Sequence, residues 1–325
     1  MKQINLARAA QTLREARAAY IFAHAHPDGD ALGSAFALAH ALRAMDKQAC
    51  VFCEDPMPAM FNYMRDGVDF LRPGDSQLFE PDLLVTVDTA AAHLLGETLQ
   101  ARYGQRIDLS IDHHATSHFY AAETYCDPTA AACAEIVSEL IDELGVAMST
   151  HMAACLYAGI STDTGCFRYA NTTARSHRYV ARYIDLGVET SPLNHVFFET
   201  QSRAYLEVER MAFNGLRYFC DDRVALVAVT QEMFRQSGSN EEEYIQLVAR
   251  TRQIEGVQVG IAIRERPNGS HKISLRSHAP VDVAAIAARM GGGGHARAAA
   301  CASDLPLEET IAMVVGHIEE ALHGA

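Results

Sequence analysis

The sequence predicts an α/β fold, in which a parallel sheet wrapped by helices is followed by a second, smaller α/β domain with a GGGGH loop. From residue 18 to about residue 183, short apolar runs alternate with longer helical ones, which is typical of parallel strands joined by helices. Beyond residue 211, strand-like segments recur, and four glycines precede a histidine at 291–295. The length of 325 residues also favours two domains over one.

The elements of the first domain follow in order from its apolar patterns. Continuous apolar runs bounded by polar residues predict buried strands, whereas longer runs rich in alanine and leucine predict helices. The expected strands cover 18–24, 48–53, 82–88 and 106–112. The expected helices cover 31–45, 130–144, 150–160 and 172–187. We therefore expect a first domain over residues 1–187.

Residues 188–211 interrupt this alternation and predict a linker with some helix, because they are more polar and contain Pro192. A second domain is expected over residues 212–325. Its expected strands cover 224–230, 256–265 and 271–277. Apolar residues alternate along the middle strand and share one of its faces: Val257, Val259, Ile261 and Ile263. We expect this sheet to be covered by other elements on one side.

Composition excludes several classes of protein. The net charge of −14 argues against binding along long duplex nucleic acid, which depends on many basic residues. The first twenty residues carry charges throughout and do not resemble a signal peptide. No stretch approaches the roughly 18 apolar residues of a membrane span. We therefore expect a cytoplasmic protein that does not contact membranes, with its eight cysteines reduced.

Acidic residues and histidines gather where predicted strands of the first domain end, and Asp163 follows the helix expected over 150–160. Ligands of an open parallel sheet bind in the crevice beyond the carboxyl ends of its strands. Four segments that lie far apart in the sequence would aim carboxylates and imidazoles at this crevice. The residues are His24, Asp28, Asp30, Asp88, Asp112, His113, His114 and Asp163. The alternative for Asp30 or Asp163 is a capping role at a helix or turn.

Such a cluster needs a counter-charge, because two carboxylates about 4 Å apart repel by roughly 1–4 kcal/mol. Carboxylate oxygens with imidazole nitrogens suit manganese, and magnesium, iron, cobalt or zinc less decisively. The ligands exceed the needs of one ion, which favours a pair about 3.5–4 Å apart, as in phosphoryl displacement. By strand alternation His113 and His114 should point to opposite sides, so that one of them faces substrate.

The motifs resemble those of the DHH phosphoesterase family. HAHPDGD with ALGS, VDT, DHH and GISTDTGCF are similar to its four motifs in order, and SLRS with VDVAAIAARMGGGGHARAA is similar to its second domain. The two-domain length most resembles the nanoRNase and pAp phosphatase branch. This resemblance implies hydrolysis of very short oligonucleotides (nanoRNA, dinucleotides) to mononucleotides, or of 3'-phosphoadenosine 5'-phosphate to AMP, or both.

The resemblance also implies roles for individual residues. His24 and Asp28 match the ligands of one Mn²⁺ ion, Asp30, His113 and Asp163 match those of a second, and Asp88 matches the carboxylate that bridges them. Asp112 would orient His113 through a hydrogen bond, and His114 would face the scissile phosphate. The expected active site lies in the cleft between the two domains.

In the second domain, the resemblance implies a phosphate site. Its residues would be Arg276, Gly291, Gly292, Gly293, Gly294 and His295. Glycines let backbone amides approach an anion, and the guanidinium fork matches phosphate oxygens. Taken alone, the four glycines are equally compatible with a flexible hinge.

The sequence is also compatible with rival functions. Within the same chemistry they are a cyclic dinucleotide phosphodiesterase, an inorganic pyrophosphatase and an exopolyphosphatase. A nucleotide-binding regulator without catalysis is less favoured, because competent residues fill every matched position. A metal buffer is also less favoured, because the phosphate loop of the second domain would serve no purpose in it. A homodimer is compatible with the sequence.

Overall fold

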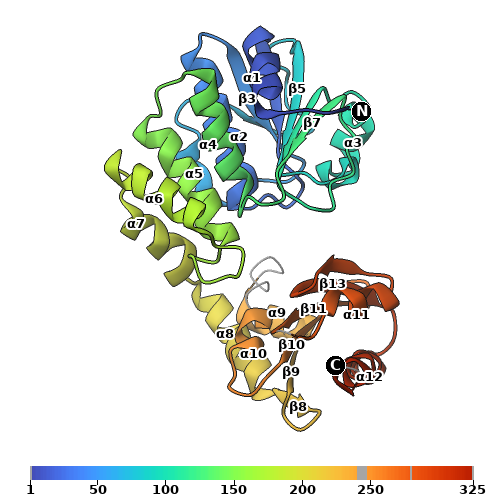
Figure 1. Ribbon diagram of the computed structural model, residues 1–325. Helices are drawn as coiled ribbons and strands as arrows, with labels where there is room; N and C mark the ends of the chain where they lie inside the picture. Colours follow the sequence, from blue (N-terminus) through green and yellow to red (C-terminus); the bar gives the residue numbers. More distant parts are fainter. Residues whose placement is uncertain (1, 240–246, 279, 324–325) are drawn as a thin grey trace. The chain divides into compact units, whose positions relative to one another are not determined.

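The computed structural model describes residues 2–239, 247–278 and 280–323, and it divides into two compact units, Met1–Thr200 and Gln201–Ala325 (Figure 1). The boundary falls within residues 188–211, the segment expected as a linker. This segment contains the short helices α7 (Thr190–Asn194) and η3 (His195–Glu199), and α8 (Arg203–Asn214) begins in it.

The predicted parallel sheet of the first unit is confirmed. In the described part of the chain this sheet has seven strands in the order β1-β7-β6-β5-β2-β3-β4, and every neighbouring pair is parallel. The strands are β1 (Lys2–Gln3), β2 (Ala18–Phe22), β3 (Gln48–Phe52), β4 (Phe70–Leu71), β5 (Leu83–Val87), β6 (Leu109–Asp112) and β7 (Glu123–Cys126). Strands β1, β4 and β7 are short and were not among the expected ones.

Helices and apolar clusters cover both faces of this sheet. The helical elements are α1 (Leu6–Glu15), α2 (Gly29–Ala44), η1 (Ala59–Met64), η2 (Ala92–Leu95), α3 (Glu97–Tyr103), α4 (Cys133–Leu144), α5 (Thr150–Asp163) and α6 (Ala174–Asp185). Helices α1, α2, α4 and α5 contribute to the larger buried cluster. An aromatic cluster that includes Tyr20, Phe22 and Phe52 packs against Leu99 and Tyr103 of α3 on the other face.

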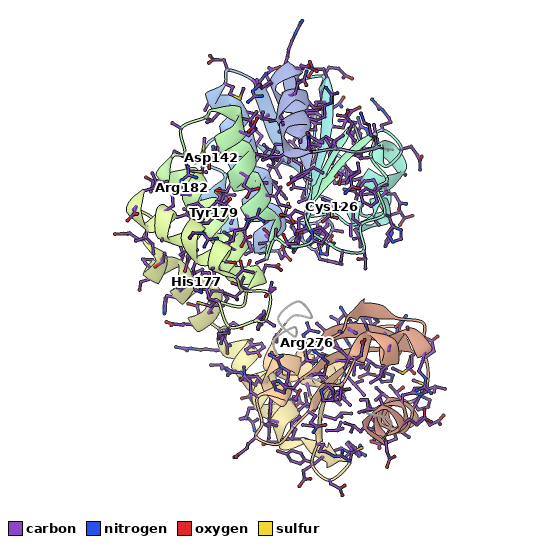
Figure 2. All side chains as sticks on the ribbon, in the orientation of Figure 1. Cys126, Asp142, His177, Tyr179, Arg182 and Arg276 are labelled. Carbon is purple, nitrogen blue, oxygen red and sulfur yellow. The ribbon has the colours of Figure 1, made fainter. Side chains whose placement is uncertain are left out.

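Small residues let α2, α4 and α5 approach one another closely. A Cβ atom on Gly33 of α2 would lie 2.3 Å from the carbonyl oxygen of Cys155 in α5. A Cβ atom on Gly159 of α5 would lie 2.6 Å from the Cβ of Ala134 in α4. Helix α6 is held against α4 by the ion pair between Arg182 and Asp142, whose Nη1 and Oδ2 atoms are 2.5 Å apart (Figure 2).

The strand order reverses between β2 and β5. Strands β3 and β4 continue the sheet on one side of this pair, and β6, β7 and β1 continue it on the other. An open parallel sheet binds ligands beyond the carboxyl ends of its strands at such a reversal. His24 lies two residues after β2, and Asp88 directly follows β5.

The second unit contains a mixed sheet. Among its described residues the sheet has six strands in the order β12-β13-β11-β10-β9-β8, in which only β9 and β10 run parallel. The strands are β8 (Arg217–Phe219), β9 (Val224–Val229), β10 (Val259–Glu265), β11 (His271–Ser277), β12 (Gly293–His295) and β13 (Ala298–Ser303). The helices after α8 are α9 (Gln231–Ser237), α10 (Leu247–Arg252), α11 (Val283–Arg289) and α12 (Leu307–His323).

The expectation that this second sheet is covered on one side was wrong. Val259, Ile261 and Ile263 pack in one cluster with residues of α11 and α12. Val227 and Val229 pack on the opposite face with residues of α8, α9 and α10. The expectation rested on the alternation in 256–265, whereas β9 is apolar at every position and supplies both faces. No helix in the described ranges is long and apolar enough to cross a membrane.

Candidate metal centre

The loop after β2 brings three of the predicted residues to the start of α2. Asp28 is the N-cap of this helix, and its Oδ1 accepts hydrogen bonds from the backbone N–H groups of Asp30 and Ala31, each at 3.0 Å. Asp30 lies in the first turn and is almost fully buried. The capping role that we considered for Asp30 therefore belongs to Asp28 within α2.

The carboxylate of Asp30 instead meets the beginning of α4. Its Oδ2 accepts a hydrogen bond from Cys133 N at 2.6 Å, and its Oδ1 accepts one from Ala134 N at 2.9 Å. The N-cap residue of α4, Ala132, has no side chain that could cap these N–H groups. Asp30 thus provides acceptors for the free N–H groups in the first turn of α4, which lies far away in the sequence. These hydrogen bonds fix the orientation of the Asp30 carboxylate.

Asp88 follows β5 in a left-handed backbone conformation, with φ of 52°. This conformation is uncommon for residues other than glycine, and such positions cluster at functional sites. It is stabilised here because Asp88 N donates a hydrogen bond to the Ile111 carbonyl of β6 at 2.9 Å. The turn points the carboxylate into the cluster, where it is 4% exposed.

Asp112 was predicted to orient His113 through a hydrogen bond; it accepts one from the backbone of His113, but the ring that it orients is that of His114. Asp112 is fully buried, and its Oδ1 accepts hydrogen bonds from His114 Nδ1 at 2.8 Å and from the backbone N–H of His113 at 2.9 Å. The ring of His113 donates instead from Nδ1 to the carbonyl oxygen of Ala130 at 3.2 Å.

The two imidazoles also lie on the same side, with ring centroids 4.5 Å apart. His113 Nε2 and His114 Nδ1 lie 3.3 and 3.7 Å from Oδ1 of Asp88. The expectation that they point to opposite sides was wrong, because β6 ends at Asp112 and strand alternation does not continue into the turn.

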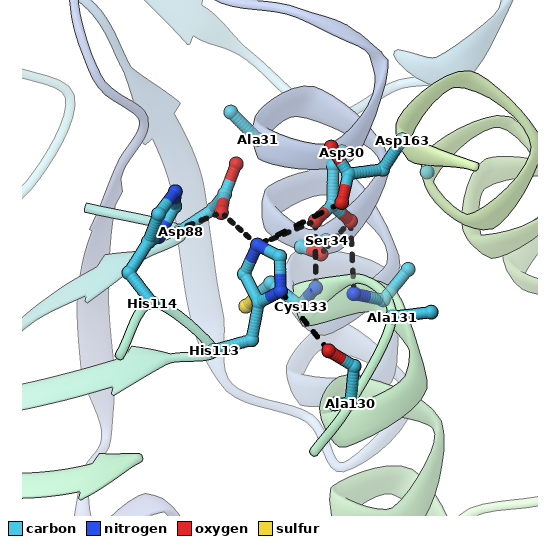
Figure 3. A network of polar contacts seen from close by, with 12 residues as sticks. Asp30, Ala31, Ser34, Asp88, His113, His114, Ala130, Ala131, Cys133 and Asp163 are labelled. Atoms are coloured by element: carbon cyan, nitrogen blue, oxygen red, sulfur yellow. Dashed lines mark hydrogen bonds and ion pairs between the residues drawn. The ribbon is translucent and has the colours of Figure 1, made fainter. Parts of the chain in front are cut away.

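These residues converge with Asp163, the last residue of α5 (Figure 3). Within the described ranges, three sets of ligand atoms each lie within 4.8 Å of one another. The sets are His24, Asp28 and Asp88; Asp30, His113 and Asp163; and Asp88, His113 and His114. Every residue that the sequence predicted as a metal ligand therefore belongs to one cluster at the strand-order reversal.

The spacing of the ligand atoms fits a bound cation. His24 Nε2 lies 3.7 Å from Asp88 Oδ2, and His113 Nε2 lies 3.8 Å from Asp163 Oδ2, which is too long for hydrogen bonds. Two atoms that each lie about 2.1 Å from one ion, at right angles, are about 3 Å apart. Oδ1 of Asp88 is buried and accepts no hydrogen bond from any described residue. These ligand atoms are arranged around a shared space and are not hydrogen-bonded to one another.

Electrostatics also favour a cation. Burial and the neighbouring charges of Asp88 and Asp163 raise the pKa of Asp30 well above its usual value. Burial and nearby carboxylates raise the pKa of Asp163 to about 7. Burial opposes protonation of the imidazoles, yet the carboxylates outweigh it and raise the pKa of His24 to about 12 and that of His113 to about 11. Without metal, protons on these rings therefore balance the carboxylates, and cations would replace them.

The predicted phosphate residues belong to the second unit. Arg276 is half-buried on β11, where it pairs with Gly260 of β10 and Ala298 of β13. Gly292 is required by packing, because its Cβ would lie 2.2 Å from the Ala300 carbonyl oxygen.

The other three glycines differ in their backbone conformation and in the space around them. Gly291 and Gly294 have positive φ of 72° and 143°, whereas a Cβ on Gly293 would meet nothing within 4 Å. The backbone of His295 ends β12, and its side chain lies outside what the structure describes.

Sequence reasoning missed the groups that hold the ligands in place. They are backbone atoms of Ala130, Cys133 and Ala134, together with the side chain of Asn171. One signal was available: the run of small residues before α4 contains no capping side chain next to the helix. An uncapped helix N-terminus requires an acceptor from elsewhere, and a buried aspartate is a suitable one.

Both units match domains of known proteins. The DHH family, N-terminal domain, matches residues 18–160, and the DHHA1 domain matches residues 222–323. The chain is 32% identical over 319 residues to the bifunctional oligoribonuclease and PAP phosphatase NrnA of Thermus thermophilus, which covers 93% of this chain and 90% of that protein. It is 28% identical to the protein of the same name from Bacillus subtilis, over 84% of this chain and 85% of that one.

A solved structure shows the same fold. The crystal structure of an exopolyphosphatase-related protein from Bacteroides fragilis matches with a TM-score of 0.89 and 24% sequence identity. The match covers 97% of this chain and 95% of that one.

Proposed function

Because the chain belongs to the DHH family, we propose that it is a phosphoesterase that hydrolyses very short oligonucleotides to mononucleotides and 3'-phosphoadenosine 5'-phosphate to AMP. The observation that carries the proposal is the convergence of carboxylates and imidazoles from four separate segments within one cluster. The two bifunctional relatives, each matched over 85% or more of its length, support the choice of substrates.

The donor set fits two divalent ions, and we assign them as Mn²⁺. His24 and Asp28 would hold one ion, Asp30, His113 and Asp163 the other, and Asp88 would contact both, since it faces both histidines. A mixture of carboxylate oxygen and imidazole nitrogen without thiolate supports manganese. When bound, such ions supply Lewis-acid stabilisation to the oxygens of a transferred phosphoryl group.

His114 is the residue that we assign to the scissile phosphate. Its Nδ1–H donates to the buried carboxylate of Asp112, which fixes the ring and its tautomer. With Nδ1 hydrogen-bonded to Asp112, Nε2 is the nitrogen that would face substrate. Burial opposes protonation of this ring, but the hydrogen bond to Asp112 outweighs it and raises the pKa of His114, so that Nε2–H of the imidazolium would protonate the leaving oxygen. Asp112 acts through His114 in this scheme, as a positioning residue.

Arg276 and the 291–294 backbone are our candidates for holding a substrate phosphate. Gly293 has open space where a side chain would be, so that an anion could approach its amide closely. The guanidinium of Arg276 offers a planar fork that matches phosphate oxygens. The resemblance assigns His295 to the same site.

A hydrolysis panel with added Mn²⁺ tests the proposal. The substrates are a dinucleotide, a longer RNA, 3'-phosphoadenosine 5'-phosphate, a cyclic dinucleotide and pyrophosphate. We expect the dinucleotide and 3'-phosphoadenosine 5'-phosphate to be hydrolysed fastest, and the reaction to stop when a chelator removes the metal. Faster turnover of pyrophosphate or the cyclic dinucleotide would favour the rival functions, and turnover in excess chelator would contradict metal dependence.

A further inference from the structure

The three ligands proposed for one ion are all connected to a single backbone segment, residues 130–134. Asp30 accepts hydrogen bonds from Cys133 N and Ala134 N. The His113 ring donates to the carbonyl oxygen of Ala130. These ligands come from α2 and from the end of β6, so this segment sets the distance between two otherwise separate elements.

Asp163 reaches the same segment through a side chain that the proposed chemistry does not use. Nδ2 of Asn171 donates one hydrogen bond to the carbonyl oxygen of Asp163 at 3.1 Å and another to that of Ala131 at 3.0 Å. An amide NH₂ has two donors and can bridge two carbonyl oxygens, whereas a carboxylate has none. Asn171 therefore ties the end of α5 to segment 130–134.

The ligands proposed for the other ion are held differently. His24 Nδ1 donates to the adjacent carbonyl of Ala25 at 2.8 Å, and Asp28 accepts from N–H groups of its own helix. Among the hydrogen bonds of the described residues, none joins His24 or Asp28 to segment 130–134. A change at Asn171 should therefore act on one ion and not on the other.

We propose that Asn171 is a positioning residue for the Asp30, His113 and Asp163 site, which it holds in register by bridging the Asp163 and Ala131 carbonyls. This inference rests on the proposed function, because it assumes that these three residues bind an ion. Groups that orient metal ligands typically change metal affinity by 10-fold to 100-fold when they are mutated. Because Asn171 acts on the backbone of a ligand, we expect an effect near the lower end of this range.

The test is calorimetric titration of Mn²⁺ into the metal-free full-length protein, with the thermal unfolding midpoint measured in parallel. The variants are Asn171→Ala and Asn171→Asp, the second of which keeps the size of the side chain but removes both donors. Thr150→Ala is the matched control. Thr150 Oγ1 donates to the Leu186 carbonyl at 2.7 Å and so also joins the α5 and α6 region, at the end remote from the cluster.

We expect both Asn171 variants to raise the Kd of one Mn²⁺ ion about 10-fold and to leave the other within about 2-fold. Thr150→Ala should lower the unfolding midpoint about as much as the Asn171 variants do, because it also removes one side chain's hydrogen bonding, but it should change neither Kd. Two unchanged Kd values in the Asn171 variants, with two ions bound by the wild type, would overturn the role of Asn171 and leave the proposed function intact. A wild-type chain that binds no Mn²⁺ would overturn both.

Discussion

Substituting alanine for Gly159 should raise the helix propensity of α5 and at the same time disturb the metal cluster. Gly159 lies inside α5, where alanine is favoured over glycine by about 1 kcal/mol. A Cβ atom at this position would, however, lie 2.6 Å from the Cβ of Ala134 and 2.7 Å from Oδ1 of Asp30. Ordinary contacts between carbon atoms are about 3.5–4.0 Å, so the neighbours must move by roughly 1 Å.

The balance of these effects predicts a modest loss of stability and a larger loss of metal affinity. Overpacking a core costs about 1–3 kcal/mol, which leaves a net destabilisation of about 0–2 kcal/mol after the gain in propensity. The displaced group is the carboxylate of Asp30, whose two oxygens accept from Cys133 N and Ala134 N. We expect Mn²⁺ affinity to fall by about 10-fold or more, because the ligand leaves its oriented position.

The matched control is Gly316→Ala, inside α12, where a Cβ would meet nothing within 4 Å. We expect this variant to gain up to about 1 kcal/mol and to bind Mn²⁺ like the wild type. Scanning calorimetry and Mn²⁺ titration on both variants provide the comparison. A Gly159→Ala protein that is stabilised as much as Gly316→Ala, with unchanged Mn²⁺ affinity, would refute the close-approach argument.

Three further predictions concern the cluster, the phosphate residues and a half-buried histidine. Asp88→Ala should reduce hydrolysis at least 100-fold with the fold intact, because it removes the carboxylate placed between both histidines; near-normal turnover of a folded, Mn²⁺-saturated variant would contradict the two-ion assignment. Arg276→Ala should raise KM for dinucleotides more than it lowers kcat, and an unchanged KM would count against phosphate anchoring. Burial lowers the pKa of His40 below its usual value of 6.5, so the unfolded chain takes up this proton more readily and the free energy of unfolding should decline as the pH falls below about 6.5. His40→Gln should make this decline shallower, as measured by urea unfolding at pH 5, 6 and 7.5; equal slopes would exclude His40 as a cause.

Local patterns were sufficient for the parallel sheet and for the choice of candidate ligands. The apolar runs at 18–24, 48–53, 82–88 and 106–112 contain β2, β3, β5 and β6. Carboxyl ends of parallel strands lie at one edge, so acids that follow those runs were expected to meet. Strands β1 and β4 have two residues each, which is too few for a pattern, and β7 has four residues of which only Thr124 is buried, so that no apolar run marks it.

The turn after β6 shows where such reasoning fails. Strand alternation places His113 and His114 on opposite sides, but it applies only while the backbone remains extended. Here the backbone leaves the strand at Asp112, whose Oδ1 accepts from both following N–H groups. The ring that Asp112 orients is therefore decided by the turn and not by the spacing of the three residues.

The sequence by itself determined the fold class, the position along the chain of the strands that bear the site, and which side chains have the chemistry to bind a cation. These depend on residue types and short spacings that can be read along the chain. Only the tertiary structure decided that Asp30 is held by Cys133 N, 103 residues away, and that Asn171 bridges two carbonyls. Backbone N–H and C=O groups are common to nearly all residue types, so their partners have no sequence signature until packing brings the helices together.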